Sequence, residues 1–121
     1  LINAMEHIMG PQNMVEAICV GADGRLEKYE RAITKAVEKV RTKSGVLVLT
    51  DMYGGTPFNL AISILNKSEL EVVAGVNLPM LIKFATCRYN CSLQECVDKV
   101  EHAGRKYISI VSKSDPQCEI K

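Results

Sequence analysis

One uninterrupted apolar run constrains the fold of this chain more than any other feature. Residues 46–50, Val-Leu-Val-Leu-Thr, contain no polar residue before the last. A strand with one face in water alternates apolar and polar residues, whereas a strand of a parallel sheet is covered on both faces. The run is therefore typical of a parallel strand between helices, and it predicts an α/β fold.

The segments around this run alternate between strand and helix patterns. Short β-branched runs predict strands over residues 14–20 and 70–76. Apolar residues at three- and four-residue steps predict helices over about 1–10, 23–40 and 57–66. Two further helices are expected to begin at the caps Asn77 and Ser92, the second ending at Gly104. Residues 107–111 are a strand candidate, and the tail 112–121 is expected to be loose.

This order of elements predicts a doubly wound, mostly parallel sheet with helices on both faces. The 121 residues fit one domain, 1–121. The helical pattern is already running at Leu1 without a capping residue, although such a domain normally begins with a strand. We therefore expect a domain that is incomplete at its N-terminus, the alternative being a frayed natural end.

Charge and cysteine content exclude several classes of function. Lys and Arg number 15 and Asp and Glu 14, which leaves no basic surface for nucleic acid or an anionic membrane. Five cysteines cannot form a closed disulfide set, so reduced thiols and a cytoplasmic location are expected. Cys87, Cys91 and Cys96 match no zinc spacing, which favours packing residues over a metal site.

A candidate anion site follows the apolar run. In open α/β sheets, ligands bind beyond the carboxyl ends of the strands. Here an acid, Asp51, is followed by Gly54 and Gly55, then by Thr56 as a helix cap and Pro57 at the first helical position. Bare backbone N–H groups and a helix N-terminus attract an anion, and Asp51 could orient a histidine by accepting its ring N–H. The alternative is a tight turn that simply needs two glycines.

A second strand tip and two histidines are weaker candidates. Residues 73–80 combine a strand end, a capping Asn77 and an apolar rim, a pattern that a capped helix start explains equally well. His7 and His102 lie in helical patterns and belong to no catalytic or metal-binding motif. Both are expected to be structural.

Residues 45–59, Gly-Val-Leu-Val-Leu-Thr-Asp-Met-Tyr-Gly-Gly-Thr-Pro-Phe-Asn, followed by residues 73–81, resemble the mannose-family IIA component of the bacterial phosphoenolpyruvate:sugar phosphotransferase system. Residues 4–12 and 103–108 are similar to other parts of that family. The resemblance implies a doubly wound homodimer. It also implies that residues 107–111 add to the sheet as an antiparallel edge strand, often exchanged between subunits.

The resemblance also implies a phosphoryl relay. The phosphocarrier HPr would phosphorylate a IIA histidine, which passes the group to a IIB component, with no metal or cofactor and with membrane contact only through IIC and IID partners. Asp51 would orient the acceptor histidine. The phosphate would bind to Met52, Tyr53, Gly54, Gly55 and Thr56, and the pocket rim would be Pro57, Asn59, Asn77, Leu78, Pro79 and Met80.

The chain departs from the family in one respect, because it contains no Thr-His-Gly motif, where the family's acceptor lies. His7 does not match that position, so the acceptor is expected upstream of Leu1 and this chain alone is expected to be inactive. Two alternatives are the phosphocarrier subunit of a dihydroxyacetone kinase and a non-catalytic regulatory module that binds a phosphorylated partner. A flavodoxin-like nucleotide binder is disfavoured, because no Gly-x-Gly-x-x-Gly or Walker motif is present.

Overall fold

Two parallel strands form the sheet in the computed structural model, which describes residues 1–21, 25–63 and 69–113. Strand β1 spans Val46–Thr50 and β2 spans Leu70–Ala74, in register from Val46 opposite Leu70 to Thr50 opposite Ala74. The parallel pairing and the α/β class are as predicted, although β2 ends two residues before its predicted limit at residue 76.

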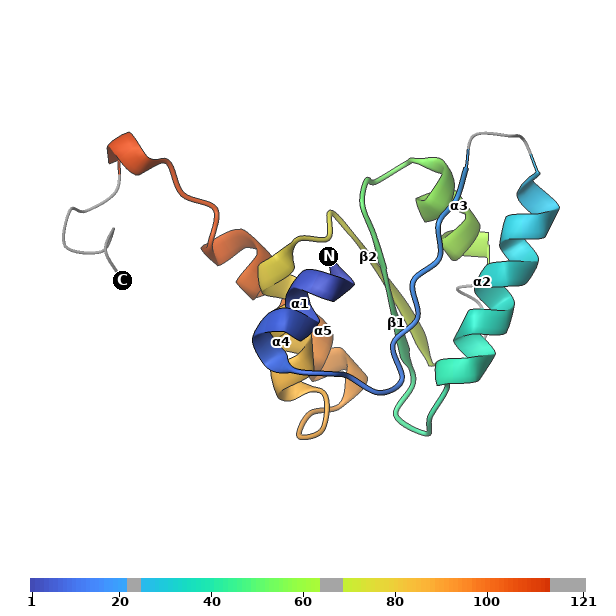
Figure 1. Ribbon diagram of the computed structural model, residues 1–121, viewed down its shortest axis with the longest axis horizontal. Helices are drawn as coiled ribbons and strands as arrows, with labels where there is room; N and C mark the ends of the chain where they lie inside the picture. Colours follow the sequence, from blue (N-terminus) through green and yellow to red (C-terminus); the bar gives the residue numbers. More distant parts are fainter. Residues whose placement is uncertain (22–24, 64–68, 114–121) are drawn as a thin grey trace.

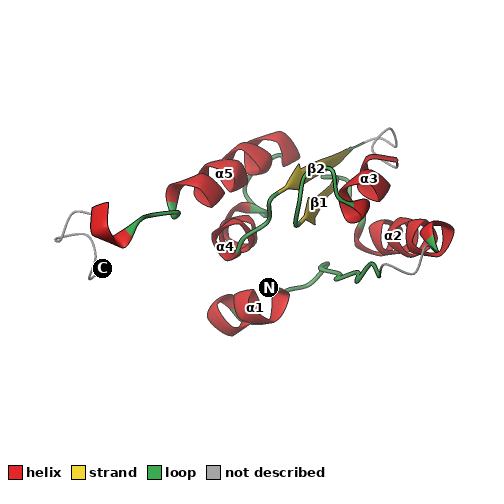
Figure 2. Cartoon of the chain, turned by 90° about the horizontal axis from the view of Figure 1, so that it is seen from above, coloured by secondary structure: helices red, strands yellow, loops and turns green. Residues whose placement is uncertain are grey.

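Five α-helices surround the strands (Figure 1). Helices α2 and α3 lie on one side of the sheet and α1, α4 and α5 on the other, and Figure 2 shows the same two groups from above. The predicted helices are confirmed at α1 (Ile2–Met9), α2 (Leu26–Val40), α3 (Thr56–Ser63), α4 (Leu78–Cys87) and α5 (Leu93–Lys106). The predicted start at residues 23–24 and the predicted end at 64–66 lie outside the described residues.

Each side of the sheet has its own apolar core. The stripe of α2, Tyr29, Ile33 and Val37, packs with Val46, Leu60 and Leu70. On the other side α4 and α5 pack together and bury Met80, Cys87, Cys96, Val100 and Ala103. Helix α5 begins with the predicted capping box, in which the Ser92 hydroxyl accepts from Glu95 N–H and the Glu95 carboxylate accepts from Ser92 N–H. The Ser92 hydroxyl also donates to the Glu95 carboxylate, and this bond and that from the Ser92 N–H lower the pKa of Glu95.

The prediction that Gly104 ends the last helix is wrong, because α5 continues to Lys106. Gly104 is buried inside the helix, and a Cβ there would lie 2.7 Å from Met80 Cγ and 2.8 Å from its sulfur. Glycine is therefore needed for the close approach of α4 and α5 rather than for helix termination.

Two predicted strands are not strands in this structure. Residues 14–20 run past β1 without pairing with any described strand, because a groove separates the two segments. Residues 107–111 make no ladder within the described chain, and Val111–Lys113 form a 3₁₀ turn. Figure 1 shows this segment leading away from the sheet, where no strand edge is available, and Ile108 is 74% exposed. The rest of the predicted loose tail, residues 114–121, lies outside the described residues.

Among the described residues, no helix has the length and apolar character that crossing a bilayer requires. The same residues contain no cluster of three or more His, Cys, Asp or Glu side chains that could bind a metal. Cys87 and Cys96 are buried with their sulfurs 3.4 Å apart, Cys91 is half-buried and Cys19 is exposed, whereas Cys118 lies outside the described part.

Candidate functional site

The loops that follow β1 and β2 lie side by side at the carboxyl edge of the sheet. The N–H groups of Gly75 and Val76 both donate to the Thr50 carbonyl, each at 2.9 Å. The end of β1 is thereby tied to the start of the second loop. Both candidate segments of the sequence, 50–59 and 73–80, therefore belong to one edge.

The loop after β1 turns sharply into α3. Gly54 has φ +81°, a left-handed conformation that favours glycine, and Gly55 N–H donates to the Met52 carbonyl at 3.4 Å. The Asn59 amide reaches back to the Gly54 carbonyl at 3.4 Å. The rings of Tyr53 and Phe58 pack with centroids 4.4 Å apart. These contacts hold the loop against the first turn of α3.

Several hydrogen-bond donors at this turn are unused. The first amide of α3 with a main-chain acceptor is that of Asn59, which donates to Gly55 O at 2.9 Å. Within the described part of the chain, nothing accepts from the N–H groups of Gly54, Thr56 or Phe58. These donors and the positive end of the helix dipole are groups that would attract an anion without any cationic side chain.

The predicted cap at Thr56 is wrong in detail. Thr56 is the first residue of α3 itself, and its hydroxyl makes no hydrogen bond within residues 1–21, 25–63 and 69–113. The side chain is exposed, so its hydroxyl is an additional free donor beside the free amides.

Asp51 directly follows β1 and is exposed, with no hydrogen bond or ion pair to any described residue. Its carboxylate would repel an anion, so it would not itself contact a phosphate. It is available to accept a hydrogen bond from a ring N–H brought to the same edge.

In the loop after β2, unlike the loop after β1, the polar side chain bonds within the protein. Asn77 Oδ1 accepts from Met80 N–H at 3.2 Å, and Asn77 Nδ2 donates to the Gly104 carbonyl at 3.0 Å. The prediction of a capped helix start is confirmed. Leu78 and Pro79 are half-buried, and the Met80 side chain is only 3% exposed, so it lies in the core rather than on a pocket rim.

Comparison with known protein families identifies the family to which this chain belongs. The family model for the PTS system fructose IIA component, EIIA-man, matches residues 1–101. This chain belongs to that family. The mannose-family resemblance of the two strand-tip motifs is thus confirmed over most of the chain.

Relatives and solved structures agree with this IIA assignment. The mannose-specific EIIAB component of Escherichia coli K12 is 36% identical over 112 residues, covering 88% of this chain and 33% of that protein. The fructose-specific EIIA component of Bacillus subtilis is 24% identical over 88% of this chain and 73% of its own length. The chain thus spans about a third of the EIIAB relatives it matches.

The crystal structure of the phosphotransferase system component EIIA from Streptococcus agalactiae superposes with a TM-score of 0.83. It is 28% identical and covers 93% of this chain and 88% of its own. The α/β architecture described above is therefore that of the IIA family.

One buried polar group near the site of this IIA chain was not predicted from the sequence. Thr50, the last residue of β1, is 6% exposed, and its Oγ1 has no hydrogen-bond partner in the described structure. A threonine that ends an otherwise apolar run was the available signal. The two histidines are exposed on helices, His7 on α1 and His102 on α5, and neither makes a hydrogen bond with the loop after β1.

Proposed function

We propose that this chain provides the phosphate cradle of a IIA component that takes a phosphoryl group from HPr and passes it to a IIB component. The observation that carries the proposal is the group of free amides at Gly54, Thr56 and Phe58 next to the unpaired carboxylate of Asp51. The relay serves sugar uptake or its regulation, in the cytoplasm, with a homodimer as the working unit.

The chemistry is a transfer between two imidazoles. A ring nitrogen of the acceptor histidine attacks phosphorus on phospho-HPr, and the P–N bond to the HPr histidine breaks as the new P–N bond forms. The cradle amides and the Thr56 hydroxyl donate to the phosphoryl oxygens, whose charge they stabilise during transfer. Met52, Tyr53 and Gly55 shape this loop, and no metal is required.

Asp51 would act through the histidine rather than on the phosphoryl group. By accepting the N–H of one ring nitrogen, its carboxylate would fix the tautomer that leaves the other nitrogen free to attack. The same hydrogen bond raises the basicity of the ring. Asp51 is thus a positioning residue in this proposal.

In this proposal, the acceptor histidine lies outside these 121 residues. The sequence has no Thr-His-Gly motif, and both of its histidines lie on helices away from any hydrogen bond with Asp51. Residues 1–121 alone are therefore expected to hold the cradle without the nucleophile.

The test is a phosphorylation assay with radiolabelled phosphoenolpyruvate, enzyme I and HPr. It compares residues 1–121 with the protein that also carries the residues encoded upstream of Leu1. Label is expected only on the longer protein, on a histidine, and is expected to pass on to a IIB component. Label on His7 or His102 of residues 1–121 would overturn the site assignment.

A binding module is the second candidate function, supported by the free amides at Gly54, Thr56 and Phe58 in a chain that has no Thr-His-Gly motif. Such a module would hold the phosphohistidine of a partner and transfer nothing. Stable binding of phospho-HPr, with no label on either protein, would favour it. Transfer from the labelled chain to a dihydroxyacetone kinase rather than to a IIB component would favour the other phosphocarrier role.

A further inference from the structure

Three of the five cysteines meet where α4 ends and α5 begins. Cys87 is the last residue of α4, Cys91 lies in the connecting loop, and Cys96 is the fourth residue of α5. The sulfurs of Cys87 and Cys96 are 3.4 Å apart, and the Cys96 sulfur is 3.9 Å from the Cys91 carbonyl oxygen. A disulfide bond is about 2.05 Å long, so only a small movement would join the first two sulfurs.

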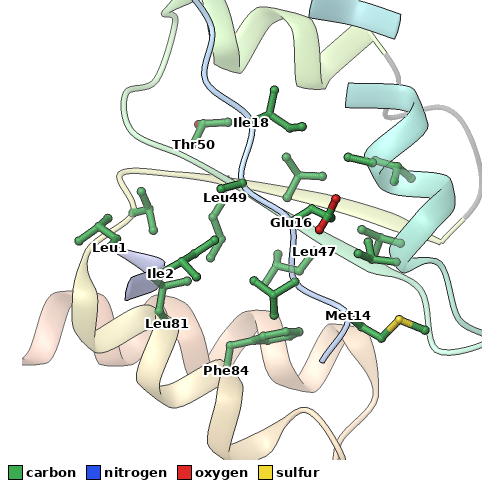
Figure 3. Close-up of a pocket in the computed structure, with 18 of the residues that line it drawn as sticks. Leu1, Ile2, Met14, Glu16, Ile18, Leu47, Leu49, Thr50, Leu81 and Phe84 are labelled. Carbon is green, nitrogen blue, oxygen red and sulfur yellow. The ribbon is translucent and has the colours of Figure 1, made fainter. Parts of the chain in front are cut away.

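The start of α5 also brings Cys91 and Cys96 together. Ser92 is the N-cap, so Cys91 precedes the cap and Cys96 is the fourth helical residue. Side chains at these two positions pack against each other across a helix start, as a hydrophobic staple. Both cysteines line one small cavity of about 90 Å³. That cavity adjoins a larger apolar groove along β1, since Met14 and Phe84, labelled in Figure 3, line both.

The three thiols differ in their exposure. Cys87 is 7% exposed and Cys96 is 2% exposed, whereas Cys91 is half-buried. Burial, and after it the neighbouring thiols of Cys87 and Cys91, raises the pKa of Cys96 to about 12. Cys96 therefore stays protonated at neutral pH, and a dissolved oxidant reaches Cys91 more readily than either buried thiol.

Cys91 is also the member of the cluster with a cationic neighbour. Lys99 Nζ donates to Cys91 Sγ at 3.3 Å, and this hydrogen bond raises the pKa of Lys99. An ammonium group beside a thiol favours the thiolate, which is the form that reacts with oxidants. Cysteines that sense oxidants combine thiolate character, access from solvent and an adjacent second thiol. Cys91 has an ammonium neighbour, partial exposure and Cys96 beside it.

We propose that Cys91, Cys96 and Cys87 form a thiol oxidation site, at which a small hydroperoxide oxidises Cys91 and a disulfide then closes to Cys96. A half-buried thiol on a small cavity admits a molecule of this size and excludes a bulky protein disulfide. The cavity is lined by Gly45 and Val46 at the start of β1, whereas the candidate anion site follows the end of that strand. The oxidation site is therefore separate from the phosphoryl relay.

The reaction has two steps. The Cys91 thiolate attacks one peroxide oxygen, so that an S–O bond forms, the O–O bond breaks, and the leaving oxygen takes up a proton as water or an alcohol. The Cys96 sulfur then attacks the sulfenic sulfur of Cys91. The S–S bond forms as the S–O bond breaks, and the departing hydroxide takes the Cys96 proton to give water. Both sulfurs are oxidised by one electron each, and one hydroperoxide is reduced.

Cys87 offers the disulfide a second position. Its sulfur could attack that of Cys96, which would release Cys91 as a thiolate and leave a buried Cys87–Cys96 bond, with no net oxidation or reduction. The distance of 3.4 Å between these sulfurs supports this exchange. A dithiol reductant would reverse either product by the same chemistry.

The test is peptide mapping of the full-length protein by mass spectrometry, after brief exposure to limiting hydrogen peroxide at neutral pH and blocking of the remaining thiols. Trypsin cuts after Lys83, Arg88 and Lys99, which separates the possible products. An internal bond in peptide 89–99 identifies Cys91–Cys96, and a link from it to peptide 84–88 identifies a bond to Cys87. One of these two disulfides is expected as the main product, and dithiothreitol is expected to reverse it. Dimedone added with the peroxide is expected to label Cys91.

Two pairs of variants test the roles of Cys91 and Lys99. Cys91→Ser is expected to slow disulfide formation at least about tenfold, because the remaining thiols are buried. Cys19→Ser, at an exposed thiol outside the cluster, is expected to leave it unchanged. Lys99→Met is expected to slow dimedone labelling about threefold or more, since the thiolate loses its cation. Lys35→Met, at an exposed lysine of α2, is expected to have no effect.

Three results would overturn the proposal. One is disulfide formation in Cys91→Ser at the rate of the unsubstituted protein. Another is a main product that involves Cys19 or Cys118 rather than Cys96. The third is oxidation of Cys91 that ends in a sulfinic acid without any disulfide. None of these measurements involves phosphoryl transfer, so failure of this proposal and failure of the proposed function are distinguishable.

Discussion

The two loops at the carboxyl edge are built from similar parts but use them differently. Each follows a parallel strand, contains a glycine with positive φ, Gly54 at +81° and Gly75 at +89°, and leads into a helix with proline in its first turn. In the loop after β2, Gly75, Val76 and Asn77 all bond within the protein. In the loop after β1, the acid, the hydroxyl and three amides remain free within the described residues.

The difference shows which loop stabilises the fold and which one is available to a ligand. Internal hydrogen bonds at the second loop fix α4 against α5, so its polar groups cannot also serve a ligand. Free donors at the first loop add no internal hydrogen bond to the fold and would be available to an anion. Substitutions at the first loop should therefore change activity, and those at the second should change stability.

Asp51→Asn is expected to give the largest effect, and on activity alone. In a form of the protein that carries the proposed acceptor histidine, we expect transfer from phospho-HPr to slow by about 10–100-fold, the range known for the loss of carboxylates that orient metal-bound histidines. The free energy of unfolding is expected to change by less than about 0.5 kcal/mol, because the side chain is exposed and unpaired. Rapid-quench phosphotransfer and urea denaturation measure the two quantities.

The control for this substitution is Asp98→Asn, the same chemical change on the exposed surface of α5. It is expected to leave transfer unchanged. Equal slowing by both variants would mean that net charge, rather than the position of Asp51, governs the reaction.

Gly104→Ala is expected to have the largest effect on stability. The added Cβ would lie 2.7 Å from the buried Met80 side chain, which has little room to move. Overpacking of this kind costs about 1–3 kcal/mol of unfolding free energy. The matched control is Gly55→Ala at the first loop, where a Cβ meets only ordinary contacts of 3.5 Å or more. If Gly55→Ala destabilised the protein as much, the contrast between the loops would be lost.

Local patterns in the sequence predicted local structure well. The stripe of α2, the apolar run of β1 and the capping box at Ser92 each depend on residues within a turn or two, and each was found as expected. The glycines and Asp51 marked the loop in which the described structure leaves several donors unused. The prediction for Gly104 was wrong because glycine is needed there to leave room for Met80, which is distant in sequence.

The failed strand predictions have a related physical cause. A strand exists only when a partner supplies its hydrogen bonds, and neither 14–20 nor 107–111 has one within the described chain. The β-branched composition of those segments was correctly recognised, but pairing depends on the whole sheet. The buried, unpaired hydroxyl of Thr50 likewise depends on which segments surround β1, so it could not be inferred from local sequence.

Asn77→Ala should produce a somewhat smaller loss of stability. The variant removes the N-cap of α4 and the hydrogen bond to Gly104 O, each worth about 1 kcal/mol. A total loss of about 1–2 kcal/mol is expected in urea denaturation. Asn59→Ala, which removes an exposed hydrogen bond of 3.4 Å at the first loop, is expected to cost only a few tenths. A reversal of this order would contradict the division of roles between the loops.

A pH dependence is also expected, and it too belongs to the packed side of the molecule. Burial, together with the hydrogen bond to Cys87, raises the pKa of Cys96 to about 12. In the unfolded chain the thiol ionises near its ordinary pKa of about 8.5. Its contribution is therefore complete below that value and is lost as the pH rises toward 12, since only the unfolded state releases the proton in between.

Urea midpoints measured at pH 8 and pH 10 test this difference. The unsubstituted chain should lose more stability over the interval than Cys96→Ala, whatever the absolute stabilities of the two proteins. Cys19→Ala is the control, because that thiol is exposed, and it should keep the full pH dependence. An equal slope in Cys96→Ala and the unsubstituted chain would show that the α4–α5 core admits the thiolate. The α4–α5 core would then be more open to solvent than the comparison with the loop after β1 implies.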